Sequence, residues 1–308
     1  MTSSSSIPSL ETTYSAGATV LKLYKCKAPD PPPDGDCSYK EGERLMSSVT
    51  DLFSTSVSRR LHISSKSPDV SITLKSRISR SHNRLPHVWT AQVQPNPEST
   101  IPSIPELVVA KIFDPVYISE EDRDSLDSPF SVRDLCVWKE VTAYQMLESL
   151  QGKTVPRFYG HFIASLGPSH QHRTVNVLLL EYIQGKDLCG IVPPDEESVA
   201  KICGEHLDGL ITAVLKCHIS LCDLGVITLD NVPRNVLLRS PSERKPHCNQ
   251  EECPLRFETG CNPDDIPLVM FDFEQVQFIE PAPSPEEDER LMSKKEYYKE
   301  TWLLGYPI

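Results

Sequence analysis

Seven segments of the chain are rich in β-branched, aromatic and other apolar residues, a composition typical of β-strands. Polar or Pro-containing breaks join the first three segments, so the pattern predicts an antiparallel meander. Two more strand-like segments follow a helical region, and the last two predict a strand pair that encloses a long polar insertion. The segments are residues 70–79, 87–94, 106–114, 157–165, 175–185, 235–240 and 267–278.

Helical periodicity occurs in two regions. In residues 131–152, apolar side chains recur at spacings of three and four, as on one face of a helix. Glu140 shares that face, and a charge on an inward stripe needs a partner because an unpaired buried charge is costly. A second pattern, about residues 197–221, predicts a long helix with a broad apolar face. His206 and His218 lie on that face and are interpreted as core histidines.

The composition limits the classes of function. The chain has 308 residues, a hydrophobic content of 39% and a net charge of −12 at pH 7, which argues against a nucleic-acid partner. No segment approaches the roughly 20 apolar residues of a membrane span, and no signal-peptide pattern begins the chain. We therefore expect no membrane association and an intracellular location, in cytoplasm or nucleus. Ten Cys, several of them in helical segments, fit reduced thiols better than a disulfide framework.

Charged and amide side chains stand at the ends of several apolar elements. Lys111 lies near the end of the third strand and Glu140 on the first helix. Asp230 and Asn235 lie in the bend TLDNVPRN, and Asp272 lies in MFDFEQ. Mg²⁺ prefers carboxylate and amide oxygens, and phosphoryl transfer depends on positioned metal and neutralised phosphate oxygens. Each residue by itself also fits a structural role: a snorkelling Lys, a salt-bridged Glu, a polar turn or a strand-end cap.

The order of these motifs resembles the protein kinase-like superfamily, especially the divergent kinase-like proteins frequent in fungal genomes. VVAKIF resembles the strand whose Lys contacts the α- and β-phosphates of ATP, which would be Lys111. KEVTAYQML is similar to the helix whose Glu pairs with that Lys, which would be Glu140. LLLEYIQG resembles the hinge, where the backbone from Glu181 to Ile183 would hydrogen-bond an adenine.

The remaining motifs imply a metal and a base. TLDNVPRN matches the Asp-x-x-x-x-Asn part of the catalytic loop, which implies Asp230 as base toward an acceptor hydroxyl and Asn235 as a Mg²⁺ ligand. MFDFEQ stands where the family has Asp-Phe-Gly, which implies Asp272 as the other protein ligand of Mg²⁺. The resemblance implies an α+β fold: a bilobal kinase-like chain with an antiparallel N-lobe sheet plus one helix, and a reduced, mainly helical C-lobe.

The resemblance and the composition together predict the domain organisation. Residues 1–65 are Ser/Pro-rich and are expected to be flexible. Residues 66–183 would form the N-lobe with the hinge. Residues 184–308 would form the C-lobe, with the catalytic loop, an insertion at 240–266 and a short C-terminal helix.

Departures from the family pattern leave two functions open. The segment SRISRSHNRLPHVW contains no Gly, although the corresponding phosphate loop is usually Gly-rich. Thr228 and Leu229 replace the usual His-Arg before Asp230, and little chain follows Asp272 to build a peptide-substrate platform. The first hypothesis is an ATP- and Mg²⁺-dependent phosphotransferase with an undetermined protein or small-molecule acceptor. The alternative is a catalytically impaired pseudokinase that acts as a nucleotide-responsive binding or scaffold module.

The insertion carries its own candidate chemistry. His247, Cys248, Cys253 and Cys261 offer the soft donors that suit Zn²⁺, but the paired C-x-x-C spacing of many zinc sites is absent. We interpret the insertion as a disordered surface loop, with metal binding as the alternative.

Overall fold

The computed structural model describes the chain in several stretches and divides it into two compact units. Unit 1 comprises Met1–Val141 and Phe158–Tyr182, and unit 2 comprises Thr142–Arg157 and Ile183–Ile308. No described helix is long and apolar enough to cross a bilayer. The described residues are 16–17, 19–26, 68–78, 86–95, 104–114, 129–166, 173–281, 289 and 292–304.

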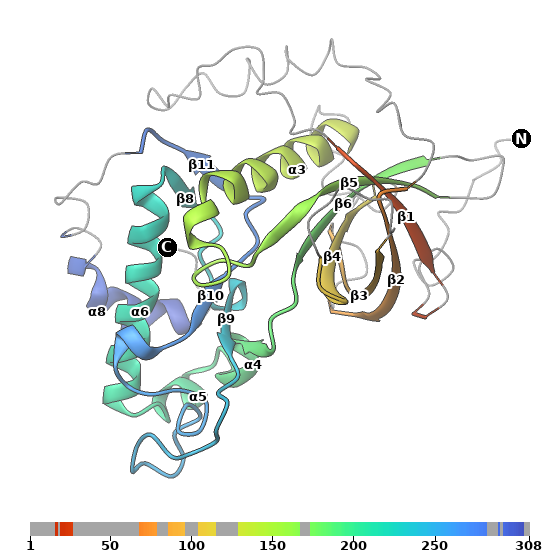
Figure 1. Ribbon diagram of the computed structural model, residues 1–308. Helices are drawn as coiled ribbons and strands as arrows, with labels where there is room; N and C mark the ends of the chain where they lie inside the picture. The colour runs from red at the N-terminus through yellow and green to blue at the C-terminus, as the bar shows by residue number, and fades with distance from the viewer. Residues whose placement is uncertain are drawn as a thin grey trace, which may run out of the picture. The chain divides into compact units, whose positions relative to one another are not determined.

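Unit 1 is built on a closed barrel of antiparallel strands in the order β1-β2-β3-β4-β6-β5 (Figure 1). The predicted meander is confirmed, because β2 pairs with β3 and β3 pairs with β4, both antiparallel. The strands are β1 (Val20–Lys25), β2 (Val70–Arg77), β3 (His87–Pro95), β4 (Leu107–Phe113), β5 (Phe158–Leu166) and β6 (Arg173–Glu181).

The predicted fold class is wrong. An antiparallel N-lobe sheet with one helix and a mainly helical C-lobe was expected, but the sheet of unit 1 closes into a barrel. Closure depends on β1, which pairs with β2 on one side and with β5 on the other. In unit 2, two small sheets and long irregular segments accompany the helices that the structure describes. Closing a sheet removes its open edges, so every barrel strand finds a backbone partner on both sides.

Strand β1 was not predicted, because the composition of residues 1–65 indicated a flexible segment. The segment is rich in Ser and Pro, yet it contains an ordered strand in which Leu21 and Leu23 are 2% and 0% exposed. These two residues alternate with polar positions, which is the local signal of a half-buried strand. A short strand far from its partners along the sequence gives no other sign of its pairing.

Strand alternation separates the barrel interior from its outer surface. Ala110 and Ile112 of β4 belong to the apolar core inside the barrel. Phe113 belongs to a second cluster, which joins β4 and β6 to residues of helix α3 (Pro129–Met146). Lys111 shares the strand face of Phe113, because side chains two positions apart point to the same side. Val137 and Val141 are the buried apolar residues that α3 contributes to this second cluster.

Unit 2 combines short strands with helices. Strands β10, β9 and β7 form one sheet, and β11 pairs with β8. The predicted pairing of residues 235–240 with 267–278 is confirmed as β9–β10, although the second segment breaks after Met270 and resumes as β11. The strands are β7 (Gly185–Asp187), β8 (Val226–Thr228), β9 (Val236–Arg239), β10 (Leu268–Met270) and β11 (Val276–Phe278).

The long helix predicted at about 197–221 is two helices. Asp195 caps the first by accepting a hydrogen bond from the Ser198 amide, and Cys203 caps the second through its sulfur. Each cap marks a helix start, because an N-cap side chain satisfies an amide that has no partner within the helix. The helices are α4 (Leu188–Ile191), α5 (Glu196–Ala200), α6 (Gly204–Asp223) and α8 (Lys295–Thr301), with 3₁₀ turns at Glu148–Leu150, Pro233–Asn235, Pro263–Asp265 and Trp302–Leu304.

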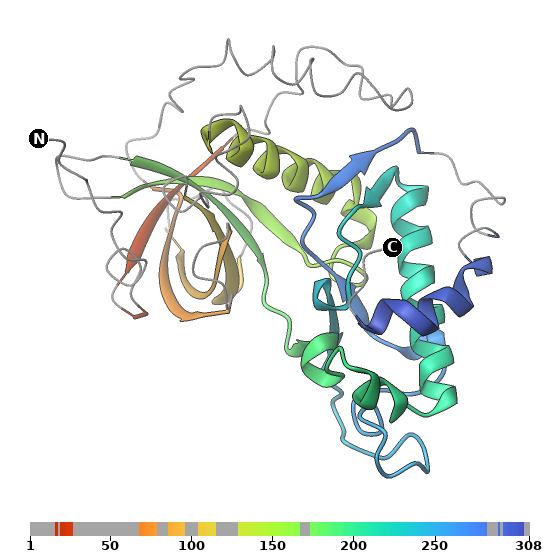
Figure 2. The same cartoon turned by 180° about the vertical axis from the view of Figure 1, so that it is seen from behind.

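Helix α8 lies against α6 in both ribbon views (Figure 2). Lys295 Nζ donates to Asp208 Oδ2 at 2.8 Å, and Lys299 Nζ lies 3.0 Å from Asp208 Oδ1. A short C-terminal helix was predicted, and α8 is such a helix. It covers part of α6, and Trp302, in the 3₁₀ turn that follows α8, reaches the polar bend after β8.

Candidate functional site

In unit 1, a buried ion pair joins the barrel to α3. Lys111 Nζ donates to both carboxylate oxygens of Glu140, each at 2.7 Å. Lys111 is 4% exposed and Glu140 is fully buried. The contact follows from two periodicities, since strand alternation points Lys111 out of the barrel and the helical repeat places Glu140 on the inward stripe of α3.

A buried ion pair of this kind contributes little net stability to a fold. Removing two charges from water costs several kcal/mol per ion, and attraction in the interior offsets that cost only when the geometry is good. Here the ammonium meets both oxygens of one carboxylate, and it also lies 5.8 Å from the centre of the Phe113 ring. A buried pair of this kind, kept where two apolar side chains would serve stability equally well, is a candidate functional group.

The two residues predicted to hold adenine lie at the division between the units. Glu181 is the last residue of β6 and pairs in register with Val108 of β4. The chain leaves unit 1 after Tyr182, and Ile183, 7% exposed, is the first residue of the following part of unit 2. Their role in binding a nucleotide stays a prediction.

In unit 2, Asp230 and Asn235 are held in one turn by side-chain hydrogen bonds. Arg234 Nη2 donates to both Asp230 carboxylate oxygens at 3.0 Å. Asn235 Nδ2 donates to the Asp230 carbonyl at 2.9 Å and to its carboxylate at 3.1 Å. These hydrogen bonds fix the Asp230 carboxylate and the Asn235 amide relative to each other. They also occupy both oxygens of the Asp230 carboxylate with donors from the same turn.

Strand pairing brings Asp272 to the same end of the sheet as Asn235. Val236, the first residue of β9, pairs with Met270, the last of β10, and the Phe271 amide donates to the Asn235 carbonyl at 3.1 Å. Asp272 follows with φ 71°, the one positive φ of a non-glycine residue in the described part of the chain. Backbone of this kind costs of the order of 1 kcal/mol or more and clusters at functional sites.

Residues that the sequence patterns did not single out support the same turn. Trp302 Nε1 donates to the Asn231 carbonyl at 3.0 Å and to its Oδ1 at 3.2 Å, and Asn231 Nδ2 donates to the Tyr298 hydroxyl at 3.1 Å. Tyr298 and Trp302 rings stack with centroids 6.3 Å apart. Two aromatic residues four positions apart in the C-terminal helix were the available signal, since such pairs share one helix face.

His218 is a buried neutral histidine beneath this turn. Its Nδ1 lies 3.4 Å from the Thr228 hydroxyl, and burial lowers the pKa of His218 to about 4, although a hydrogen bond to Asn231 opposes this shift. His206, the other predicted core histidine, is also fully buried. Its surroundings are not those of an ordinary core residue.

The insertion brings a group of soft donors to His206. Cys203, His206, Cys248 and Cys253 offer ligand atoms that all lie within 4.8 Å of one another. Of the residues named from the sequence, Cys248 and Cys253 belong to this group, whereas His247 and Cys261 do not. The expectation of a disordered loop is wrong, because the structure describes residues 240–266 in full. Cys203 and His206 form a Cys-x-x-His pair at the start of α6, and that spacing was the signal that could have identified them.

The segment SRISRSHNRLPHVW, which stands where the family has its phosphate loop, lies partly outside the described residues. Arg80 and Arg84 belong to residues 79–85, between β2 and β3, which the structure does not describe. Arg77 ends β2, and burial lowers the pKa of Arg77.

Comparisons with known proteins assign no family. No protein-family model matches the chain, and a search among curated proteins gives no match. The solved structure "Crystal structure of BubR1 kinase domain" is 14% identical with a TM-score of 0.41, and the likeness covers 79% of this chain but only 63% of that one. "WaaP in complex with acyl carrier protein" is 14% identical with a TM-score of 0.38, over 73% of this chain and 71% of that one. TM-scores this low carry no argument about family or activity.

Proposed function

We propose that this chain is an ATP- and Mg²⁺-dependent phosphotransferase that acts on an alcohol group of a protein or a small molecule. The observation that carries the proposal is the buried ion pair of Lys111 and Glu140. An ammonium held in place by a carboxylate is pre-organised to neutralise phosphate oxygens, and its desolvation strengthens that interaction.

Unit 2 supplies the other groups that the reaction needs. We assign Asn235 and Asp272 to Mg²⁺, because an amide and a carboxylate oxygen are suitable ligands for it. We assign Asp230 as the base that accepts the acceptor's hydroxyl proton while the terminal phosphoryl group passes from ATP to that oxygen and ADP leaves. The backbone from Glu181 to Ile183 is proposed to hydrogen-bond the adenine.

A second function is favoured by a different observation. The Asp230 carboxylate already accepts hydrogen bonds from Arg234 and Asn235, with Arg234 bound to both oxygens. These donors occupy both carboxylate oxygens and compete with an acceptor hydroxyl for them. The chain would then be a nucleotide-responsive binding or scaffold module without turnover.

Nucleotide binding is the first test, because both functions require it. Thermal unfolding of the full chain with Mg²⁺-ATP should show stabilisation of about 2.7 kcal/mol at a ligand concentration of 100 times Kd. Lys111→Met should lose most of this stabilisation. Lys75→Met, a change at an exposed lysine on β2 of the same barrel, should keep it. Equal stabilisation of both variants would remove Lys111 from the site, and no stabilisation of the unmodified chain would contradict both functions.

Turnover separates the two functions. Release of labelled γ-phosphate from ATP should be lost in Asp230→Asn while the thermal stabilisation by Mg²⁺-ATP survives. Asp264→Asn, which alters an exposed acid bound to Lys216 in the same unit, should leave release unchanged. Binding without release in the unmodified chain would select the scaffold function. Release that persists at full rate in Asp230→Asn would contradict the assignment of the base.

A further inference from the structure

Three thiols and one imidazole converge at the N-terminal end of α6. We call Cys203, His206, Cys248 and Cys253 the thiol cluster. His206 Nδ1 lies 3.1 Å from Cys203 Sγ and 3.4 Å from Cys253 Sγ. A tetrahedral Zn²⁺ ion with ordinary bond lengths separates its sulfur ligands by about 3.8 Å and its sulfur and nitrogen ligands by slightly less. The cluster, whose ligand atoms lie within 4.8 Å of one another, needs to shift by about an ångström or less to meet that geometry.

The tautomer of His206 suits a metal ligand. Its Nε2 lies 3.0 Å from the Thr259 carbonyl oxygen. A carbonyl only accepts, so Nε2 carries the hydrogen and Nδ1 presents its lone pair to the sulfur atoms. Metal-bound histidines commonly have their other ring nitrogen fixed by a backbone carbonyl in this way.

Hydrogen bonding alone does not account well for the arrangement. The single lone pair at Nδ1 accepts one S–H hydrogen, yet two sulfur atoms lie within 3.4 Å of it. Backbone amides also point at the sulfurs: the His206 amide donates to Cys203 Sγ and the Cys203 amide to Cys253 Sγ, each at 3.5 Å. The two sulfur atoms and the Nδ1 lone pair therefore face one another as a set of soft donor atoms, the kind that Zn²⁺ prefers.

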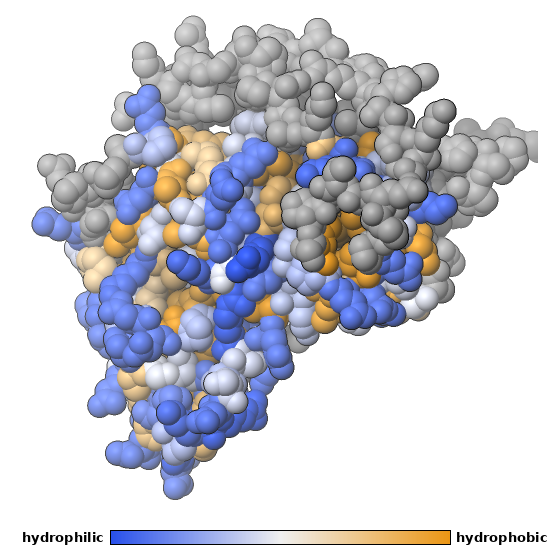
Figure 3. All heavy atoms as spheres, viewed as in Figure 1, coloured by the Kyte–Doolittle hydropathy of each residue, from blue (hydrophilic) through white to orange (hydrophobic). Residues whose placement is uncertain are grey.

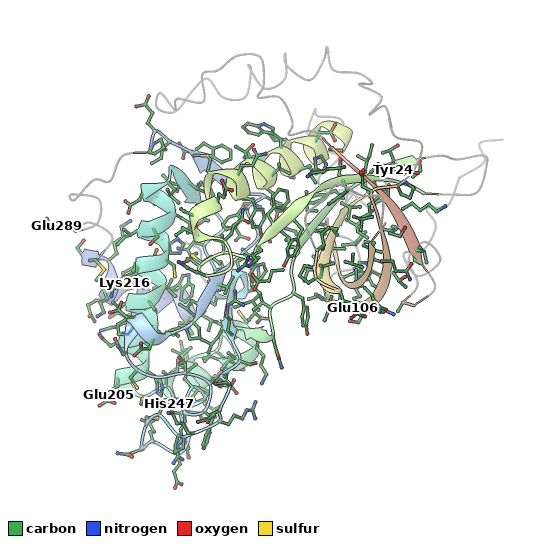
Figure 4. The ribbon with its side chains drawn as sticks, viewed as in Figure 1. Tyr24, Glu106, Glu205, Lys216, His247 and Glu289 are labelled. Atoms are coloured by element: carbon green, nitrogen blue, oxygen red, sulfur yellow. The ribbon has the colours of Figure 1, made fainter. Side chains whose placement is uncertain are left out.

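The insertion, residues 240–266, keeps its conformation with little regular backbone structure. Apart from one 3₁₀ turn it contains no helix or strand in the structure, and its face in Figure 3 is mostly hydrophilic. It nevertheless approaches α6 closely, since a Cβ atom on Gly209 would lie 2.0 Å from the Cys261 carbonyl oxygen. Figure 4 shows Glu205, in the first turn of α6, and His247, in the insertion, at the same end of unit 2. Long segments without helix or strand are uncommon in compact domains, and those that occur are usually functional or disordered.

We propose that a structural Zn²⁺ ion fastens the insertion to the N-terminal end of α6, held by Cys203, His206, Cys248 and Cys253. The ligand pairs have the spacings Cys-x-x-His and Cys-x₄-Cys, short spacings typical of structural zinc sites. Binding converts three thiols to thiolates and releases their protons, so the closed site carries one net negative charge. With four protein ligands no position is left for substrate, which makes the role structural.

Metal content tests the proposal directly. The full chain, purified without chelator and desalted, should contain about one Zn²⁺ per chain by elemental analysis. Cys253→Ser and Cys248→Ser should each reduce the bound zinc several-fold. Cys261→Ser is the matched control, because this thiol donates to the His247 carbonyl at 3.8 Å and lies in the insertion but outside the cluster. Its zinc content should equal that of the unmodified chain.

Spectroscopy and alkylation identify the ligands even if one variant folds poorly. The chain reconstituted with Co²⁺ should show thiolate-to-cobalt charge-transfer bands, and Cys248→His should keep a tetrahedral cobalt spectrum with weaker charge transfer. Removing zinc with a chelator should make Cys203, Cys248 and Cys253 react faster with an alkylating reagent. Cys136, a half-buried thiol of unit 1, should react at an unchanged rate.

Three results would overturn the site. The first is an unmodified chain that takes up no stoichiometric zinc or cobalt. The second is full zinc content in a folded Cys248→Ser variant, with folding checked by circular dichroism. The third is a disulfide joining two cysteines of the cluster in protein alkylated at lysis. None of these measurements depends on nucleotide binding, so the zinc site and the phosphotransferase proposal can fail separately.

Discussion

The barrel of unit 1 and the insertion of unit 2 reach fixed conformations by different means. The barrel is joined by antiparallel ladders all the way round and encloses one apolar core. The insertion has almost no backbone ladder, and specific side-chain contacts hold it: Lys216 with Asp264, Gln250 with the Lys201 carbonyl, and the thiol cluster. Regular structure satisfies backbone groups without help from side chains, whereas irregular structure depends on individual residues.

This difference predicts different sensitivities. The stability of a barrel held by apolar burial should fall mainly when a substitution changes the volume of a core side chain or removes one partner of a buried ion pair. Unit 2 should respond to pH and metal, because buried histidines and thiols contribute to its packing. Substitutions at four residues test the comparison, from the largest expected effect to the smallest.

Glu140→Ala should have the largest effect. It leaves the 4% exposed Lys111 without the carboxylate that contacts it at 2.7 Å, and breaking a buried ion pair typically costs about 3–5 kcal/mol. Chemical denaturation measures the free energy of unfolding. Glu106→Ala, which removes an exposed partner of Gln92 at the start of β4 (labelled in Figure 4), should cost about 0.5 kcal/mol or less. A double variant, Lys111→Met with Glu140→Leu, should recover much of the free energy of unfolding that Glu140→Ala loses. If Glu140→Ala and Glu106→Ala lower it by similar amounts, burial of the ion pair is unimportant for stability.

His218 should make the stability of unit 2 depend on pH. Its pKa is about 4 in the folded chain against 6.5 for an ordinary histidine, so the unfolded chain binds the extra proton between these values. The free energy of unfolding should therefore fall as pH decreases through this window, by at most about 3 kcal/mol, with no further contribution below it. His218→Gln should remove this part of the slope. Parallel pH profiles would show that His218 titrates normally.

Trp302→Phe tests how far α8 stabilises the polar turn. The substitution deletes the two hydrogen bonds to Asn231 and leaves a space at a fully buried position, with an expected cost of about 2 kcal/mol. Tyr297→Phe on the same helix is the control, because Tyr297 is 50% exposed and should change stability by less than about 0.5 kcal/mol. Equal effects of the two substitutions in urea denaturation would mean that α8 does not support the turn.

Substitutions of Asp272 should have the smallest effect on stability. Comparing two of them separates the cost of the backbone conformation from the loss of the carboxylate. Asp272→Gly and Asp272→Ala both remove the carboxylate, but only Gly adopts φ 71° without steric cost. The Gly variant should therefore be more stable than the Ala variant by about 1 kcal/mol. An Ala variant as stable as the Gly variant would show that the turn relaxes when the side chain changes.

The sequence by itself determined the elements whose signals are local. Strand-rich segments located β2, β3 and β4, and the helical repeat placed Glu140 on an inward stripe where it needs a partner. That this partner is Lys111 was implied only by the resemblance to the kinase-like superfamily. The break between α5 and α6 is marked by Cys203, the N-cap of α6, but the apolar repeat continues across it and hid it.

Only the tertiary structure decided which distant segments meet. Closure of the barrel depends on β1 finding β2 and β5, and the thiol cluster depends on Cys203 and His206 meeting two cysteines of the insertion. Backbone edges and soft ligands are chemically alike wherever they occur along a chain, so their partners are selected by how the whole chain packs and not by any local repeat. For that reason the sequence indicated that Glu140 needs a buried partner, but it predicted a disordered loop for the insertion and an open sheet where the structure has a closed barrel.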